Sequence, residues 1–409
     1  MADDRADQTT PYDASAITVL SGREAVRKRP GMYIGATGQR GLHHLVYEVV
    51  DHSEHEVMAG CADEIHVTLL ADGGVRVVDD GCGIPVDLGP EGKPAVEVLM
   101  TELYYGAMPD WATEHAQASG APYRIWLAVV NALSERLEVE VRRQGHVWRQ
   151  SYHRGIPDAP LARGETTTAT GTTITFWADP EIFSTTVYDA DVLRWWFRQL
   201  AFLVRGLHRL TFIDERDPHS DPETFSGGLA DYIVYLNRGG HYPYPRGVGR
   251  HDGPDAHQGE HRKPIHSEII VLEAKDAEQR IRAEIAMQWT DSDDESLRTF
   301  VNTILTSQGG THAEGFRKAV TSLIAQYAKE AGLRAGKLGA AAICQGLTAV
   351  VNVTMADPHF AGPTAEYLDN AEVKTFVQKA VTERFGDWLT HHPDAAETIA
   401  RHAVQAATV

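Results

Sequence analysis

Cysteine is scarce in this chain of 409 residues: Cys61, Cys82 and Cys344 are the only three, and they lie far apart. No pair has the close spacing of a zinc motif or a disulfide framework, which favours a reduced protein of the cytoplasm. Long apolar runs are also missing, since none approaches the ~20 residues of a membrane helix, and the polar residues 1–10 lack a secretory apolar segment. We therefore expect a soluble, cytoplasmic protein with no membrane partner.

An excess of positive charge is missing as well. The formal net charge is -19 and the sequence pI is about 5.5, which disfavours a generally basic nucleic-acid-binding surface but leaves room for a local arginine patch. At ~100–200 residues per domain, the length predicts two or three domains, each with a substantial core.

Apolar alternation and turn residues predict an α+β organisation. Residues 64–70 and 73–79 alternate around an Asp-Gly-Gly turn and indicate a hairpin, and residues 137–152 indicate a second strand pair. Residues 214–228 are rich in Asp, Pro, Ser and Gly, as is typical of a boundary between domains.

The second part of the chain has its own pattern. We expect strands at residues 268–272 and 284–289, a helix at residues 316–330, and helical spacing over residues 372–407. Residues 238–263 are dense in Gly, Pro and His, without a fixed ligand spacing, and we interpret them as a mobile surface loop rather than a metal site.

Several ordered motifs carry a family resemblance. They are Val-Arg-Lys-Arg-Pro-Gly-Met-Tyr-Ile-Gly (residues 26–35), Gly-Leu-His-His-Leu-Val-Tyr-Glu-Val-Val-Asp (41–51), Asp-Asp-Gly-Cys-Gly-Ile-Pro (79–85), Val-Val-Asn-Ala-Leu-Ser (129–134), Thr-Gly-Thr (170–172) and Gly-Gly-Thr-His-Ala-Glu-Gly-Phe-Arg (309–317). Together they resemble the N-terminal region of the bacterial DNA gyrase B subunit, within the GHKL superfamily.

The resemblance implies a GHKL (Bergerat-type) α/β sandwich followed by a ribosomal-S5-like transducer domain. We expect an N-terminal arm at residues 1–20, the ATPase-like domain at 21–228 and the transducer-like domain at 229–409. The acidic metal-binding cleavage domain that follows the transducer in gyrase is absent, so we expect no direct DNA cleavage by this chain alone.

The resemblance also implies roles for retained residues. Glu48 matches the general base that activates water, and Asp79 matches the acceptor of the adenine amino group. The other matching positions lie beside the adenine (Arg143 and Thr172), in the turn beneath it (Gly81, Gly83, Ile84 and Pro85), and on an arm that reaches the partner's nucleotide in a homodimer (Tyr12). For Gly81 and Gly83, a strand-ending turn that needs positive φ is an equal alternative.

The positions that should hold the phosphates differ from the family in three places. His52 replaces the asparagine that binds magnesium, and imidazole is a poor ligand for this ion. Residues 121–126, Ala-Pro-Tyr-Arg-Ile-Trp, replace a glycine-rich lid whose backbone N–H groups close on the phosphates, and Ala365 replaces a lysine that reaches the γ-phosphate. The sequence therefore predicts little or no ATPase activity and no bound cofactor, with binding of ATP and magnesium in doubt.

The replacements suggest new chemistry at the same place. On a helix, Glu48, His52, His55 and Glu56 fall within an arc of roughly 100°, so they form one face directed at the pocket. Glu48 and His52 could act as base and acid, with His55 beside them. Two alternatives stay open: a transition metal held by Glu48, His52 and His55, and a solvated polar face, especially for Glu54 and Glu56.

Aromatic residues gather in the sequence region of the lid. They would line a pocket for an apolar or planar small molecule, or simply fill a vacant nucleotide site. These residues are Tyr104, Tyr105, Tyr123 and Trp126, together with Met108 and Trp111.

Three functional hypotheses follow, in order of preference. In the first, the pocket is repurposed to bind or transform a small metabolite, with Glu48 and His52 as an isomerase, cyclase or hydrolase pair in specialised metabolism. In the second, the chain is a non-catalytic partner of gyrase subunits or titrates a gyrase ligand. In the third, it is a divergent ATP-dependent fragment of a type II topoisomerase B subunit.

Overall fold

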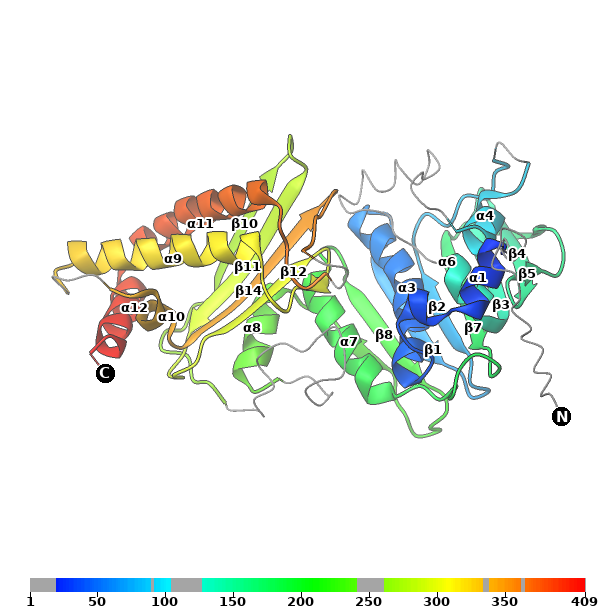
Figure 1. The fold of residues 1–409 in the computed structure, drawn as a ribbon, viewed down its shortest axis with the longest axis horizontal. Coiled ribbons are helices and arrows are strands. Elements are labelled where there is room, and N and C mark those ends of the chain that lie inside the picture. Colours follow the sequence, from blue (N-terminus) through cyan, green and yellow to red (C-terminus); the bar gives the residue numbers. More distant parts are fainter. Residues whose placement is uncertain are drawn as a thin grey trace, which may run out of the picture.

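The computed structural model describes residues 20–89, 92–103, 127–240, 261–333, 338–361 and 365–408. These residues form two β-sheets with their helices, which lie next to each other along the longest axis of the molecule (Figure 1). The chain therefore has an α+β architecture with two successive layered bodies.

The first body contains a sheet of nine strands within the described residues, in the order β5-β4-β3-β7-β2-β1-β8-β9, with β6 paired to β4. Its elements are α1 (Gly22–Lys28), α2 (Gly31–Ile34), α3 (Gln39–Met58), β1 (Glu64–Leu69), β2 (Val75–Asp79), α4 (Ala95–Thr101), α6 (Leu127–Ala132), β3 (Ser134–Arg143), β4 (His146–His153), β5 (Ile156–Pro157), β6 (Ala162–Thr166), β7 (Gly171–Ala178), α7 (Ala190–Leu203), β8 (Arg209–Asp214) and β9 (Glu223–Phe225).

Both hairpins expected from the sequence are confirmed. β1 pairs antiparallel with β2, and β3 pairs antiparallel with β4. Alternation buries Ile65, Val67 and Leu69 of β1 beneath α3, and each fully buried side chain of this size contributes about 1.5–3 kcal/mol. Because α3 contacts β1, β2 and β7, its C-terminal half lies beside the end of β2.

The second body contains a sheet of five strands in the described part of the chain, in the order β10-β11-β14-β12-β13. Its elements are α8 (Leu229–Asn237), β10 (Ile270–Asp276), β11 (Ile281–Trp289), β12 (Ser296–Val301), β13 (Ile304–Leu305), α9 (Thr311–Glu330), α10 (Ala340–Cys344), β14 (Leu347–Met355), α11 (Ala371–His391) and α12 (Pro393–Ala406). The expected strands and helices of this region are thus present, although the helix predicted from residue 316 begins at Thr311.

The long helices α9 and α11 pack against each other over the second sheet (Figure 1). Gly315 permits this contact, since a Cβ atom there would lie 2.4 Å from the carbonyl oxygen of Lys374. None of the helices in the described ranges combines the length and apolar character that a membrane span needs.

An apolar cluster joins the two bodies. Leu203 at the end of α7 packs with Ile233 of α8 and Val350 of β14, and Asn352 Nδ2 donates a hydrogen bond of 3.1 Å to the Leu203 carbonyl. The side chain of Thr303, in the turn between β12 and β13, is in hydrogen-bond contact with the side chain of Glu54 of α3. The second body therefore touches the helix that covers the first sheet.

Candidate functional site

The carboxylate of Asp79, at the end of β2, is the centre of a buried polar network. Asp79 is 2% exposed. Its Oδ1 accepts hydrogen bonds from the N–H groups of Gly81 (3.1 Å) and Thr172 (3.0 Å), and its Oδ2 accepts one from Ser53 Oγ (3.0 Å). Thr172 Oγ1 in turn accepts the N–H of Ile84 at 3.3 Å. The network joins α3, β2, β7 and the turn after β2.

Glycine is required where these strands meet. Gly171 has φ +126°, and a Cβ atom there would lie 2.1 Å from the Asp79 carbonyl oxygen. Gly83 has φ +76°, so the alternative of a strand-ending turn that needs a positive φ is correct for this glycine. Gly81 has no positive φ, but a Cβ atom would lie 2.6 Å from Glu56 Oε2, so its small size makes room for a carboxylate.

Two arginines of β3 hold this turn in place. Arg143 Nη1 donates to the carbonyl oxygens of Cys82 (3.1 Å) and Gly83 (2.7 Å), and Arg142 Nη2 donates to the carbonyl oxygen of Asp79 (3.1 Å). The structure therefore brings Asp79, Gly81, Ile84, Arg143 and Thr172 together, with the half-buried Pro85 next in the chain. Ser53 and Gly171 belong to the same assembly: sequence reasoning missed Ser53, and it quoted Gly171 within the Thr-Gly-Thr motif without giving it a role.

Helix α3 carries an unusual amount of buried charge beside this network. Burial raises the pKa of Asp51 to about 7, and burial together with Asp51 raises the pKa of Glu54. Burial also raises the pKa of Asp79, against the opposing effect of nearby His52. Glu54 and Glu56 are 3% and 4% exposed, so the alternative of a solvated polar face is wrong for both residues. The second body and the turn after β2 cover them.

The predicted acid/base residues of α3 have different partners. Glu48 Oε1 lies 3.7 Å from His44 Nε2, and Glu56 Oε2 accepts the N–H of Cys82 at 2.9 Å. His55 Nδ1 donates to the Asp51 carbonyl within the same helix at 2.7 Å, and His52 is 1% exposed. These contacts extend from the helix itself to the turn after β2 and to His44, and the predicted acid/base pair of Glu48 and His52 stays a prediction.

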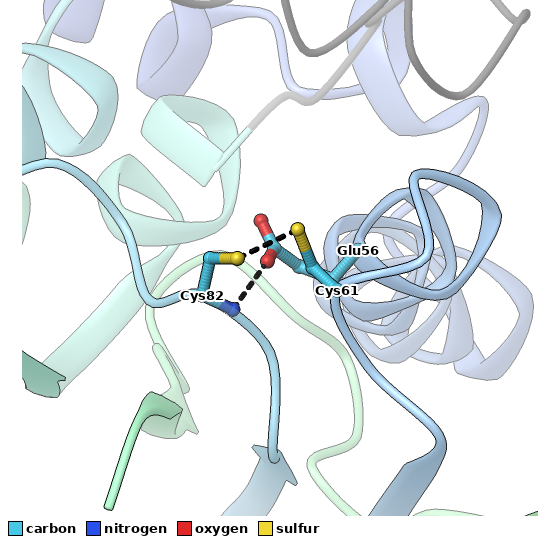
Figure 2. A group of neighbouring side chains, drawn as sticks. All are labelled: Glu56, Cys61 and Cys82. Atoms are coloured by element: carbon cyan, nitrogen blue, oxygen red, sulfur yellow. Dashed lines mark hydrogen bonds between the residues drawn. The ribbon is translucent and has the colours of Figure 1, made fainter.

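Cys61 and Cys82, separated by 20 residues, have their sulfur atoms 2.6 Å apart beside Glu56 (Figure 2). The expectation that the cysteines are far apart therefore holds only along the sequence. Burial, together with Cys82 and Glu56, raises the pKa of the Cys61 thiol to about 12. The β1–β2 hairpin causes this proximity, because it returns the chain to the end of α3. The hairpin predicted at residues 64–79 was therefore the feature of the sequence that could have indicated that Cys61 and Cys82 lie close together.

Some predicted residues lie outside the described part of the chain. They are Tyr12, Tyr104, Tyr105, Met108, Trp111, Tyr123, Trp126 and the rest of the lid segment 121–126, and His241, His251 and His257 of the tract dense in Gly, Pro and His. Ala365 is described and has φ 56°, beside the backbone contact between Gln308 and Glu366.

Two family matches, which cover the site and the second body, define the class of protein. Residues 37–182, which include α3, Asp79 and Thr172, match the family described as "Histidine kinase-, DNA gyrase B-, and HSP90-like ATPase", and residues 228–409 match "DNA gyrase B". The chain therefore has the GHKL ATPase fold followed by a transducer domain, which confirms the predicted fold class.

Individual relatives agree with both matches. The chain is 46% identical to the DNA gyrase B subunit of Streptomyces coelicolor and to the novobiocin-resistant one of Streptomyces niveus, covering 98% of this chain and 58% of each relative. The 43K ATPase domain of Thermus thermophilus gyrase B, solved with an aminocoumarin, superposes with a TM-score of 0.79 at 35% identity, over 95% of both chains. The chain belongs to the DNA gyrase B family and spans about 58% of the length of these relatives.

These comparisons correct the preferred functional hypothesis. Identity of 46% to gyrase B subunits over 98% of the chain contradicts a metabolite enzyme built on Glu48 and His52. The third hypothesis, a fragment of a type II topoisomerase B subunit, agrees better with these findings.

Proposed function

We propose that this chain is the nucleotide-binding and transducer part of a gyrase-B-type protein, and that Asp79 recognises adenine. The observation that carries this proposal is the remaining capacity of the Asp79 carboxylate. A carboxylate offers about four acceptor sites, and the three hydrogen bonds described above use two on Oδ1 and one on Oδ2. Oδ2 can thus accept one more donor, such as the exocyclic amino group of adenine.

The phosphate end supports binding without efficient hydrolysis. His52 stands where the family resemblance places the magnesium ligand, and an imidazole that is 1% exposed is a poor substitute for a hard oxygen ligand. The residue at this position therefore does not fit a family-type magnesium site. Glu48, with His44 3.7 Å away, remains in place as a base.

We further propose that the chain acts as a dimer within a gyrase-type complex, which is supported by its 46% identity to proteins that are themselves gyrase subunits. Nucleotide binding at Asp79 would then be transmitted through α3, because Thr303 of the second body contacts Glu54 on this helix. Sedimentation of the chain with and without nucleotide tests this part of the proposal, and a monomer under both conditions contradicts it.

The decisive experiment is calorimetric titration with a non-hydrolysable ATP analogue, with and without magnesium, and with adenosine. We expect both ligands to bind, with little dependence on magnesium. Asp79→Asn should weaken binding by about 10- to 150-fold, because a hydrogen bond to a charged group is worth about 1.5–3 kcal/mol. Asp87→Asn is the matched control, since Asp87 is exposed and its carboxylate accepts a hydrogen bond from Gln144. The proposal fails if no adenine compound binds. It also fails if Asp79→Asn binds the ligands as tightly as the wild type and has the same melting temperature.

A phosphate-release assay tests the second half of the proposal. We expect turnover close to background in the wild type and a magnesium-dependent increase in His52→Asn, because an amide oxygen replaces imidazole. Adding Glu48→Gln to that variant should remove the gain. Turnover by the wild type that Glu48→Gln abolishes would show that His52 is no obstacle to hydrolysis.

A further inference from the structure

A compact group of potential metal ligands lies at the edge of the site, at the junction of α3 and the turn after β2. Glu56 is on the last turns of α3, Cys61 follows the helix, and Cys82 lies in the turn (Figure 2). One ligand atom from each residue lies within 4.8 Å of the other two. The adenine acceptor Asp79 precedes Cys82 in the same segment, but it is not part of this group.

We propose that Glu56, Cys61 and Cys82 form a zinc(II) site with one position open to solvent. Two thiolate sulfurs and one carboxylate oxygen are ligands that zinc accepts, and three protein ligands with an open fourth position is an established zinc arrangement. Thiolates also disfavour magnesium and calcium, which select oxygen ligands. The donor set therefore selects a different ion from the one used in nucleotide chemistry.

The geometry accommodates zinc after a small movement of the thiols. With Zn–S bonds of about 2.3 Å, tetrahedral coordination places two sulfurs roughly 3.8 Å apart, compared with 2.6 Å in this structure. Cys82 is exposed and Cys61 is only partly buried, so rotation of their side chains can open this separation. The open side of Cys82 also gives water access to the fourth position.

The carboxylate is already held in position. Glu56 is 4% exposed, and its Oε2 accepts the Cys82 N–H at 2.9 Å. Gly81 leaves room for the group, because a Cβ atom there would lie 2.6 Å from Glu56 Oε2. Bound zinc would join the end of α3 to the turn whose Cys82 and Gly83 carbonyl oxygens accept hydrogen bonds from Arg143.

The test titrates zinc ions into the reduced, chelator-stripped chain against a chromophoric zinc indicator. We expect one equivalent to bind, and cobalt(II) in its place to give a thiolate charge-transfer band. Cys61→Ser and Cys82→Ser should each weaken binding by at least about 100-fold, beyond the 10- to 100-fold typical of an outer-shell partner. Glu56→Gln should weaken it while keeping an oxygen that can accept the Cys82 N–H.

Cys344→Ala is the matched control, because this buried cysteine lies in the second body and should leave binding unchanged. The proposal is overturned if the reduced wild type binds no zinc, or if binding persists in the Cys61→Ser/Cys82→Ser double variant. If the chain binds no zinc but loses the mass of two hydrogens under mild oxidation, Cys61 and Cys82 form a disulfide instead of a metal site. Because no nucleotide is used, failure of this test is distinct from failure of the proposed function.

Discussion

Both bodies of this protein bury polar side chains, but they do so in different ways. In the second body, Thr299 Oγ1 and Thr306 Oγ1 lie 2.7 Å apart, and Thr306 Oγ1 lies 3.1 Å from His312 Nε2. These neutral groups bond to each other inside the fold. In the first body, Asp79 and Glu56 are carboxylates held beside a turn whose Cys82 is exposed. Buried charge beside an exposed turn at the end of a strand therefore indicates a site, whereas a closed neutral network indicates a scaffold.

The largest expected effect comes from glycines that allow close backbone contacts in each body. Gly171→Ala adds a Cβ atom 2.1 Å from the Asp79 carbonyl, and Gly315→Ala adds one 2.4 Å from the Lys374 carbonyl. We expect each change to cost more than about 3 kcal/mol of unfolding free energy, mainly in its own body. Segment-resolved hydrogen exchange measures this: β7 amides should lose protection in Gly171→Ala, and α9 amides in Gly315→Ala.

The control for this prediction is Gly145→Ala in the β3–β4 turn. Gly145 has φ +76° with no atom within 4 Å of a Cβ, so only backbone strain of about 1 kcal/mol is expected. If Gly171→Ala or Gly315→Ala reduces hydrogen-exchange protection equally in both bodies, the two bodies open as one unit. That result would contradict the difference between the bodies proposed here.

A second, smaller effect is the response to acid. Burial lowers the pKa of His312 to about 3 and that of His43 to about 4, so each body loses stability as the pH falls below about 6.5, the unfolded value. Between pH 6.5 and pH 5, one such histidine lowers the free energy of unfolding by about 2 kcal/mol, because each pH unit corresponds to about 1.36 kcal/mol. In the first body this loss is partly offset, because burial raises the pKa of Asp51 to about 7. Asp51 takes up a proton in the folded state over the same pH range, which increases the free energy of unfolding of the first body.

We therefore expect β14 amides to lose more opening free energy than β7 amides between pH 6.5 and pH 5, after correction for intrinsic exchange. Asp51→Asn should remove the part of the compensation that this carboxyl provides and make the first body more acid-sensitive than in the wild type, while Glu54 and Asp79, whose pKa values are also raised by burial, still take up protons there. If the wild type already shows equal losses in both sheets, the buried carboxylates of α3 do not take up protons in this range.

The smallest effect tests the junction. Arg205 Nη1 lies 2.8 Å from Glu273 Oε2 and 3.4 Å from Glu284 Oε1, and its side chain is 53% exposed. Arg205→Ala should therefore cost less than about 1 kcal/mol of unfolding free energy, but we expect the two bodies to unfold less cooperatively with each other in calorimetry than in the wild type. Arg149→Ala is the matched control, because Arg149 is 48% exposed and pairs with Glu140 and Glu165 within the first sheet. A larger loss of this cooperativity in Arg149→Ala than in Arg205→Ala would contradict a role for Arg205 in the junction.

Much of the fold was predictable because alternation reports burial. The β1–β2 hairpin, the β3–β4 pair and the helices after residue 311 follow from local patterns, which remain valid in any tertiary setting. Asp79 and Thr172 were found through family motifs. Ser53 was not found, because a serine within a helix gives no local sign of the carboxylate that it bonds.

The sequence by itself determined the family, the order of elements and the residues at the end of β2, since these depend on local periodicity and on motifs. Tertiary structure alone decided the surroundings of α3. This helix is covered by the first sheet and by Thr303 of the second body, so Glu54 and Glu56 are buried although a polar helical pattern suggests exposure. It also decided that Cys61 and Cys82 meet, because the distance between side chains depends on the path of the backbone and not on their separation along the chain.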